Sequence, residues 1–147
     1  MAKKKYTYDY PRPAVTADVV VVTLEAQPRV LLIRRKHDPF ADCWALPGGF
    51  VNMEESLEDA ARRELLEETG VCLGTLEQLA AFGAPQRDPR GRVISVAFLA
   101  RVDPGQVQPR GGDDATEAAW HPLRRLPKLA FDHREILALA KRRLRSD

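Results

Sequence analysis

The sequence has 147 residues, of which 44% are hydrophobic and 30% are charged, a composition typical of a single soluble globular domain. Its 23 lysines and arginines and its 21 acidic residues leave a formal net charge of +2, which gives no indication of a nucleic-acid or membrane surface. We therefore expect one domain over residues 1–147, whose partners are neither nucleic acids nor membranes.

The start of the chain, MAKKKYTYDYPRP, is basic, but it lacks the apolar segment of a secretory signal. No stretch of the sequence approaches the length of a membrane span. Cys43 and Cys72 have no metal-binding spacing and make no disulfide framework, which favours a reduced, cytoplasmic protein. We expect residues 1–13 to form an irregular arm, whose alternating tyrosines pack locally, stack on a base or close a homodimer.

Two strands are predicted next. Residues 14–23, AVTADVVVVT, are β-branched and apolar, which predicts a buried strand in which Asp18 needs a partner. Residues 29–35 form a second apolar run, and the two runs suit a hairpin. The basic residues that end this run, Arg34 and Arg35, either protect a sheet edge from aggregation or contact phosphate.

An unusually acidic segment covers residues 49–71, where six glutamates fall within about four helical turns. On a helix, Glu64 and Glu68 share a face and Glu67 lies beside them. Like charges at this spacing destabilise a bare helix. Either this is a solvated helix with charge pairs such as Arg63 to Glu67, or the carboxylates share a hard divalent cation, Mg²⁺ or Mn²⁺.

The rest of the chain predicts more strands and a last helix. Residues 76–82 fit a strand or a short helix, residues 93–102 a clear strand, and residues 115–120 a short strand. Asp132 is a good cap for a helix from 133 to about 145. Several strands with two helices indicate an α+β fold.

The acidic segment resembles the signature of the Nudix hydrolases: Gly, five residues, Glu, seven residues, then Arg-Glu-aliphatic-any-Glu-Glu-any-Gly-aliphatic. Chance agreement is of order one in a billion per starting position. The preceding WALPGG is also common before this signature. The resemblance implies a curved mixed β-sheet sandwiched between α-helices (α/β/α), with a helix over 55–68. The matching residues are Gly49, Glu55, Arg63, Glu64, Leu65, Glu67, Glu68, Gly70 and Val71.

Nudix enzymes use metal ions to hydrolyse a nucleoside diphosphate linked to another group. By this resemblance, Glu64 and Glu68 are the principal ligands of Mg²⁺ or Mn²⁺, and Glu67 binds directly or through water. The Gly48 carbonyl completes the ligand set, and Arg63 orients the carboxylates.

Family members differ in their general base, which is a signature glutamate in some and an acid on a later loop in others. The candidates here are Glu64, Asp113, Asp114 and Glu117, although turn chemistry also explains the later three.

The substrate expected from the resemblance is ADP-ribose, which would give AMP and ribose 5-phosphate. Pro85, 15 residues beyond Gly70, and the stretch LAFDH at 129–133 are similar to the ADP-ribose pyrophosphatases. The arginines among the expected contacts would bind the phosphates or the ribose, although a charged, solvent-exposed loop also explains why arginines occur there. The expected substrate contacts are Arg34, Arg87, Arg90, Arg92 and Asp114.

Other substrates and one non-enzymatic role compete with this prediction. The other substrates are oxidised nucleoside triphosphates, dinucleoside polyphosphates and NADH, although NADH-cleaving relatives usually carry additional zinc-binding cysteines. Some nicotinamide-related transcriptional regulators fuse a similar ADP-ribose-binding domain to a winged helix. The complete signature, and a chain that ends at Asp147, favour the enzyme over such a sensor.

Overall fold

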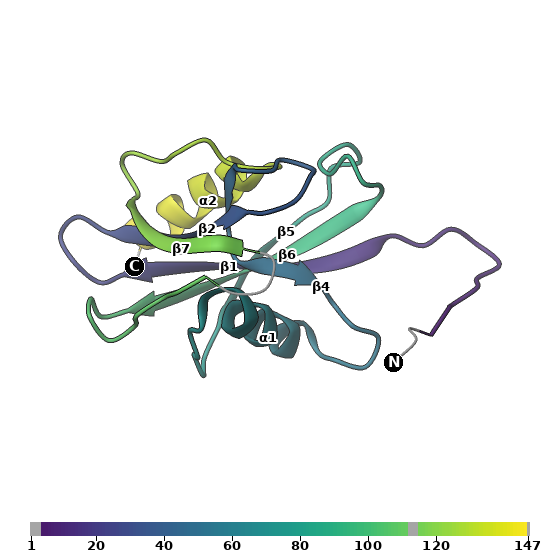
Figure 1. The fold of residues 1–147 in the computed structure, drawn as a ribbon, viewed down its shortest axis with the longest axis horizontal. Coiled ribbons are helices and arrows are strands. Elements are labelled where there is room, and N and C mark those ends of the chain that lie inside the picture. The colour runs from purple at the N-terminus through teal and green to yellow at the C-terminus, as the bar shows by residue number, and fades with distance from the viewer. Residues whose placement is uncertain (1–3, 112–114, 147) are drawn as a thin grey trace.

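The computed structural model describes residues 4–111 and 115–146, and within these ranges one mixed β-sheet carries a helix on each face (Figure 1). This confirms the predicted α+β class. The strands are β1 (Ala14–Thr23), β2 (Arg29–Arg35), β3 (Trp44–Ala45), β4 (Gly48–Phe50), β5 (Glu77–Phe82), β6 (Val93–Val102) and β7 (Ala115–Pro122), and the helices are α1 (Leu57–Thr69) and α2 (His133–Ser146).

Strand β1 is buried on both faces, as its nearly continuous apolar sequence predicts. Val19 and Val21 pack in the cluster that contains α1, whereas Val20 and Val22 pack in the cluster that contains α2. Successive side chains of a strand point to opposite faces, so one strand supplies both layers of the core. β1 also pairs in parallel with β6 along its whole length.

Two different strands share the other edge of β1. Near its end, Val22 pairs with Val30 of β2, which confirms the predicted hairpin. Near its start, Asp18 pairs with Gly48 of β4. This change of partner brings the short segment 45–49 beside the charged residue that interrupts β1.

Helix α1 begins two residues later than the predicted range 55–68. Ser56 caps the helix, because its side chain accepts a hydrogen bond of 3.1 Å from the Asp59 N–H. Gly70 follows the last turn with φ 74°, and its N–H donates to the Leu66 carbonyl at 2.9 Å. The predicted glycine end of the helix is therefore confirmed.

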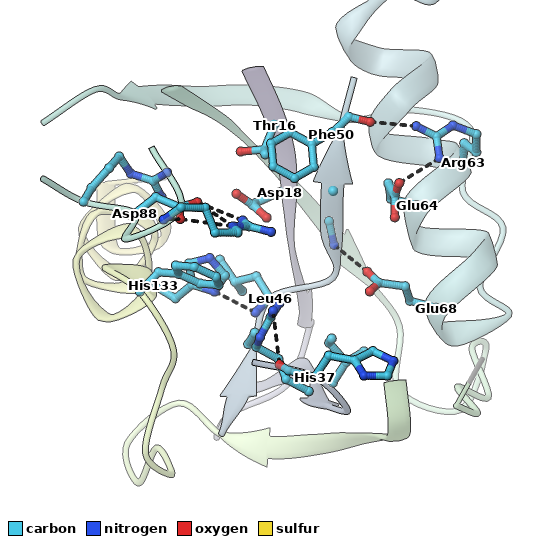
Figure 2. A pocket seen from close by; sticks show the side chains of 18 of the residues that line it. Thr16, Asp18, His37, Leu46, Phe50, Arg63, Glu64, Glu68, Asp88 and His133 are labelled. Carbon is cyan, nitrogen blue, oxygen red and sulfur yellow. Dashed lines mark hydrogen bonds and ion pairs between the residues drawn. The ribbon is translucent and has the colours of Figure 1, made fainter. Parts of the chain in front are cut away.

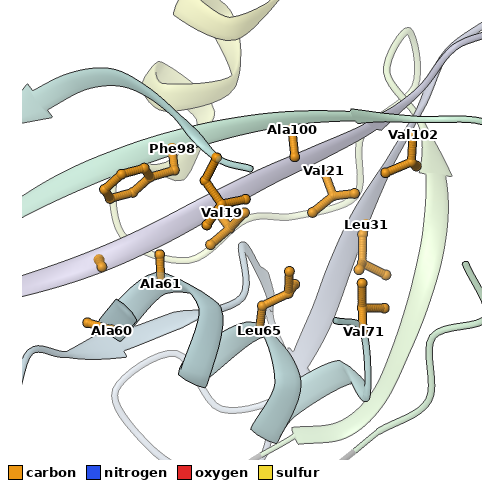
Figure 3. Close-up of a cluster of buried hydrophobic side chains, with 12 residues drawn as sticks. Val19, Val21, Leu31, Ala60, Ala61, Leu65, Val71, Phe98, Ala100 and Val102 are labelled. Atoms are coloured by element: carbon orange, nitrogen blue, oxygen red, sulfur yellow. The ribbon is translucent and has the colours of Figure 1, made fainter. Parts of the chain in front are cut away.

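Small and apolar side chains fix α1 on the sheet. Figure 3 shows Ala60, Ala61 and Leu65 beside Val19 and Phe98. The two alanines let the helix backbone approach the strands closely, and Leu65 is fully buried. Burying one such leucine stabilises the fold by about 1.5–3 kcal/mol. This packing places the signature carboxylates at a fixed height above the sheet.

Helix α2 covers the opposite face and starts at His133, as predicted. Asp132 directly precedes it, and its carboxylate accepts two hydrogen bonds from Arg87, at 2.6 and 2.9 Å. The predicted cap residue therefore also connects the loop before β6 to the start of α2. Within the described part of the chain, residues 4–13 contain no helix or strand, and no helix is long and apolar enough to cross a membrane.

Candidate active site

A cavity of about 470 Å³ lies beside β4, between α1 and the start of α2. This volume falls in the range of roughly 300–1,000 Å³ found for small-ligand sites. Figure 2 shows Glu64 and Glu68 of α1 on one side of the cavity, and Asp88 and His133 on the other. Asp18 of β1 lies between the two sides. Six separate segments of the chain therefore meet here.

The α1 side of the cavity is acidic. Glu68 is buried, and its Oε1 accepts a hydrogen bond of 2.7 Å from the Gly48 N–H. Glu64 lies against Gly49, where an added Cβ would come within 2.5 Å of the Glu64 carboxylate carbon. Position 49 therefore requires a glycine, because any side chain there would displace the Glu64 carboxylate.

Arg63 compensates the charge of this acidic side. Its guanidinium donates two hydrogen bonds to Glu55, at 2.6 and 2.9 Å, and one to Glu64 at 2.7 Å. It also donates to the Phe50 carbonyl at 3.0 Å and to Glu67 at 3.3 Å. The hydrogen bonds with Glu55 are the main reason that the pKa of Arg63 is raised and the pKa of Glu55 is lowered. Glu55 thus fixes the guanidinium of Arg63, and the guanidinium in turn holds the carboxylate of Glu64 in place.

The donor groups on the α1 side fit a hard divalent ion. Glu64 and Glu68 supply carboxylate oxygens to one cavity, and the backbone of Gly48 lies next to them. Glu67 is exposed and does not line the cavity. Among the described residues, no three His, Cys, Asp or Glu side chains form a ready-made metal cluster. Two carboxylates that share an ion with substrate phosphates are the usual arrangement for Mg²⁺.

The opposite side of the cavity is a polar wall in which acids and bases are paired. Arg87 is bonded to Asp132, and the Arg87 side chain is only 3% exposed. Arg90 is bonded to Asp88 at 2.8 Å and lies over the rings of Phe50 and Phe131, at 4.7 and 5.1 Å from their centres. The residues of the polar wall are Asp18, Arg87, Asp88, Arg90, Asp132 and His133.

These pairs keep the polar wall ionised. Burial is the largest influence on the pKa of Asp88 and acts to raise it, but the hydrogen bonds and charge of Arg90 bring that pKa below its usual value. Burial likewise acts to lower the pKa of Arg87, but Asp132 raises it overall. Each arginine therefore carries a full charge that a neighbouring carboxylate balances.

His133 and Asp18 occupy the deepest part of the polar wall. His133 is 4% exposed, and its Nδ1 accepts a hydrogen bond of 3.0 Å from the Leu46 N–H. Burial lowers the pKa of His133, so the ring is neutral near pH 7. Asp18 is 6% exposed and accepts a hydrogen bond from the hydroxyl of Ser95, which is the partner that the sequence required.

The other predicted site residues lie away from the cavity. Arg34 and Glu117 pair across β2 and β7 at 3.3 Å, on the surface and outside the cavity lining. Arg92 is exposed and donates to the Gly83 carbonyl at 2.7 Å. Asp113 and Asp114 lie outside the described residues.

Sequence reasoning did not assign several residues that line the cavity. Arg35 is an exception, because phosphate contact was one of its two expected roles; it lines the cavity, and its guanidinium donates to the Pro39 carbonyl at 2.8 Å. Arg34 does not line the cavity, and the register of β2 with β7 shifts between the two arginines. The sequence marked Asp18 only as a charged residue that interrupts an apolar strand. His133 ends the stretch LAFDH and Asp88 lies between Arg87 and Arg90, but neither residue was assigned a role from the sequence.

Comparison with known proteins identifies a family. The model of the NUDIX domain matches residues 12–140. An ADP-ribose pyrophosphatase of Methanocaldococcus jannaschii is 46% identical over 134 residues, which cover 91% of this chain and 76% of that protein. The ADPR responsive transcriptional repressor NtrR of Acinetobacter baylyi is 38% identical over 92% of this chain, which spans 56% of the repressor. The NUDIX domain of Shewanella oneidensis NrtR, solved in complex with ADP ribose, is 34% identical with a TM-score of 0.84, covering 93% of this chain and 94% of that one.

Proposed function

Because this chain belongs to the Nudix hydrolase family, we propose that it hydrolyses ADP-ribose to AMP and ribose 5-phosphate. The observation that carries the proposal is that Glu64 and Glu68 line one cavity beside the Gly48–Gly49 edge of β4. The relative named as an ADP-ribose pyrophosphatase and the NUDIX domain complexed with ADP ribose both support this substrate.

Nudix hydrolases generally need a divalent metal ion, and the ion proposed here is Mg²⁺ or Mn²⁺. Glu64, Glu68 and the carbonyl of Gly48 would hold it, whereas Glu67, predicted as a further ligand, lies outside the cavity lining and is bonded to Arg63. Such an ion supplies positive charge for the diphosphate and lowers the pKa of a bound water. Arg63 keeps the Glu64 carboxylate directed at the cavity, and the Gly48 N–H does the same for Glu68.

The general base is proposed to be Glu64, which lines the cavity, whereas Glu117 does not and the candidates Asp113 and Asp114 lie outside the described residues. A base must come within hydrogen-bond reach of the attacking water in a plausible substrate pose. Arg35 also lines the cavity and would supply positive charge for the diphosphate. The arginines Arg87 and Arg90 are bonded to Asp132 and Asp88. A cytoplasmic location and a homodimer remain predictions from the sequence.

The proposal is tested by incubating the protein with ADP-ribose and Mg²⁺ and separating the products by liquid chromatography. We expect AMP and ribose 5-phosphate in equal amounts, no turnover in EDTA, and recovery when Mg²⁺ is added in excess. Oxidised nucleoside triphosphates, dinucleoside polyphosphates and NADH serve as competing substrates. Turnover of one of these with ADP-ribose untouched would refute the substrate assignment.

A second candidate function is an ADP-ribose sensor without catalysis. The similarity to the repressor NtrR and to the NrtR domain favours it. The complete signature opposes it, because every carboxylate expected for catalysis is present. Calorimetry separates the two functions, since a sensor binds ADP-ribose in the presence of Mg²⁺ and releases it unchanged.

A further inference from the structure

His133 presents one fixed hydrogen-bond donor to the cavity. The Leu46 N–H donates to Nδ1 at 3.0 Å, so the proton of the neutral ring is on Nε2. Within the described residues, this is the one hydrogen bond that the imidazole makes, and the side chain is buried while it lines the cavity. Because His133 lines the cavity, a bound ligand that accepts a hydrogen bond from Nε2 is stabilised.

Asp18 presents an acceptor close to this donor. The negative charge of Asp18 is the largest electrostatic influence on His133 after burial, which indicates that the two groups are neighbours. Ser95 donates to Oδ2 of Asp18, and Oδ1 lies on the side of Gly48. Figure 2 shows Asp18 between β4 and His133. The same part of the cavity therefore offers both an acceptor and a donor.

The charge of the polar wall opposes phosphate as the ligand at this place. Asp132 balances the charge of Arg87, and Asp88 balances that of Arg90. Phosphate sites instead present arginines whose charge is not already balanced. A hydroxyl group suits this wall, because it donates to a carboxylate and accepts from an N–H.

We propose that Asp18 and His133 bind the hydroxyl groups of a ribose, with Asp18 accepting and the Nε2–H of His133 donating. This assignment rests on the proposed function, and it adds which side of the cavity holds a sugar. ADP-ribose contains two riboses with the same vicinal hydroxyls, one in its AMP half and one at its other end. The diphosphate lies toward Glu64 and Glu68, so a ribose next to it reaches the polar wall.

His133 and Asp18 are tested by three substitutions, of which His133→Asn and Asp18→Asn keep the internal hydrogen bonds with Leu46 and Ser95. In His133→Asn, the amide oxygen takes the place of Nδ1 and still accepts from Leu46, but the Nε2 donor is gone. In His133→Gln, the amide nitrogen takes the place of Nε2 and restores a donor. Asp18→Asn still accepts from Ser95 but loses the carboxylate. His121→Asn is the matched control, because His121 lies on β7 outside the cavity lining.

Each variant is assayed with ADP-ribose and with two analogues, each lacking the 2-hydroxyl of one of the two riboses. We expect His133→Asn to lower kcat/KM for ADP-ribose about 2- to 10-fold, the effect of one neutral hydrogen bond. For the analogue that lacks the bound hydroxyl, His133→Asn and the wild type should have equal kcat/KM. The analogue that gives this result shows which of the two riboses contacts His133. His133→Gln should recover part of the loss, and His121→Asn should behave as the wild type.

Equal losses on all three substrates would overturn the proposal, because they would mean that His133 and Asp18 only support the fold. Wild-type kcat/KM in both His133→Asn and Asp18→Asn would overturn it as well. If the wild type hydrolyses no ADP-ribose, the proposed function fails, and calorimetry with AMP and with ribose 5-phosphate tests the ribose site separately. Weaker binding of one of these by His133→Asn then supports the site, and unchanged binding of both refutes it.

Discussion

Substituting Gly49 with alanine tests whether the position of Glu64 controls activity. The new Cβ would lie 2.5 Å from the Glu64 carboxylate carbon, whereas ordinary van der Waals contact begins at 3.4 Å. The carboxylate must therefore retreat by about 0.9 Å. Arg63 opposes this movement, because it is bonded to Glu64 at 2.7 Å and is itself fixed on Glu55. A misplacement of about 1 Å can lower a rate about 100-fold, which is the loss in kcat that we expect.

The measurement is kcat for ADP-ribose at saturating Mg²⁺, with Tm and circular dichroism recorded to show that the variant folds. Gly74→Ala is the matched control, since nothing lies within 4 Å of a Cβ at that position. This control should keep wild-type activity. A folded Gly49→Ala protein with the kcat of the wild type would refute the argument that Glu64 must lie against β4.

Other parts of the site make separate predictions. Glu68→Gln should lower kcat at least about 100-fold with the fold kept, and near-normal turnover would contradict the proposed ligand role. Asp132→Ala leaves the charge of buried Arg87 without its partner, which should cost about 3–5 kcal/mol in urea unfolding. In contrast, Glu25→Ala removes an exposed ion pair and should leave the urea midpoint close to that of the wild type. Because burial lowers the pKa of His133, the unfolded chain binds its proton first as pH falls, so stability should decrease below about pH 6.5. Urea unfolding at pH 5 and pH 8 checks this, and His133→Asn should lose less stability on acidification than the wild type.

Local sequence patterns were sufficient wherever the structure depends on neighbours along the chain. The apolar run of β1 predicted a buried strand because both of its faces are covered. The spacing of Glu64 and Glu68 placed both on the cavity side of α1, since residues four apart share a helix face. The start of α1 was missed by two residues because Ser56 provides the cap, which leaves Glu55 outside the helix to bind Arg63.

Local patterns could not predict which side chains meet across the sheet. Arg34 and Arg35 are adjacent and chemically identical, and their facing depends on the pairing of β2 with β7, whose register shifts between these two residues. The polar wall combines β1, the loop before β6 and the start of α2. Arg87 was predicted to contact substrate, but its partner Asp132 lies 45 residues away in the sequence. Such distant pairs are fixed by tertiary packing.

The two glycines of β4 explain how one cavity can hold two groups of carboxylates. Neighbouring strand residues face opposite sides, and a Cβ on Gly48 would collide with Asp18, whereas one on Gly49 would collide with Glu64. At these two glycines, only the backbone of β4 separates the carboxylate of Glu64 from that of Asp18. A diphosphate held near Glu64 can then have its attached ribose within reach of Asp18, although these residues belong to different elements. A Cβ at Gly49 meets only the Glu64 side chain, so Gly49→Ala should slow hydrolysis, whereas a Cβ at Gly48 also meets the backbone of Ala17 and Asp18, so Gly48→Ala should destabilise the pairing of β1 with β4.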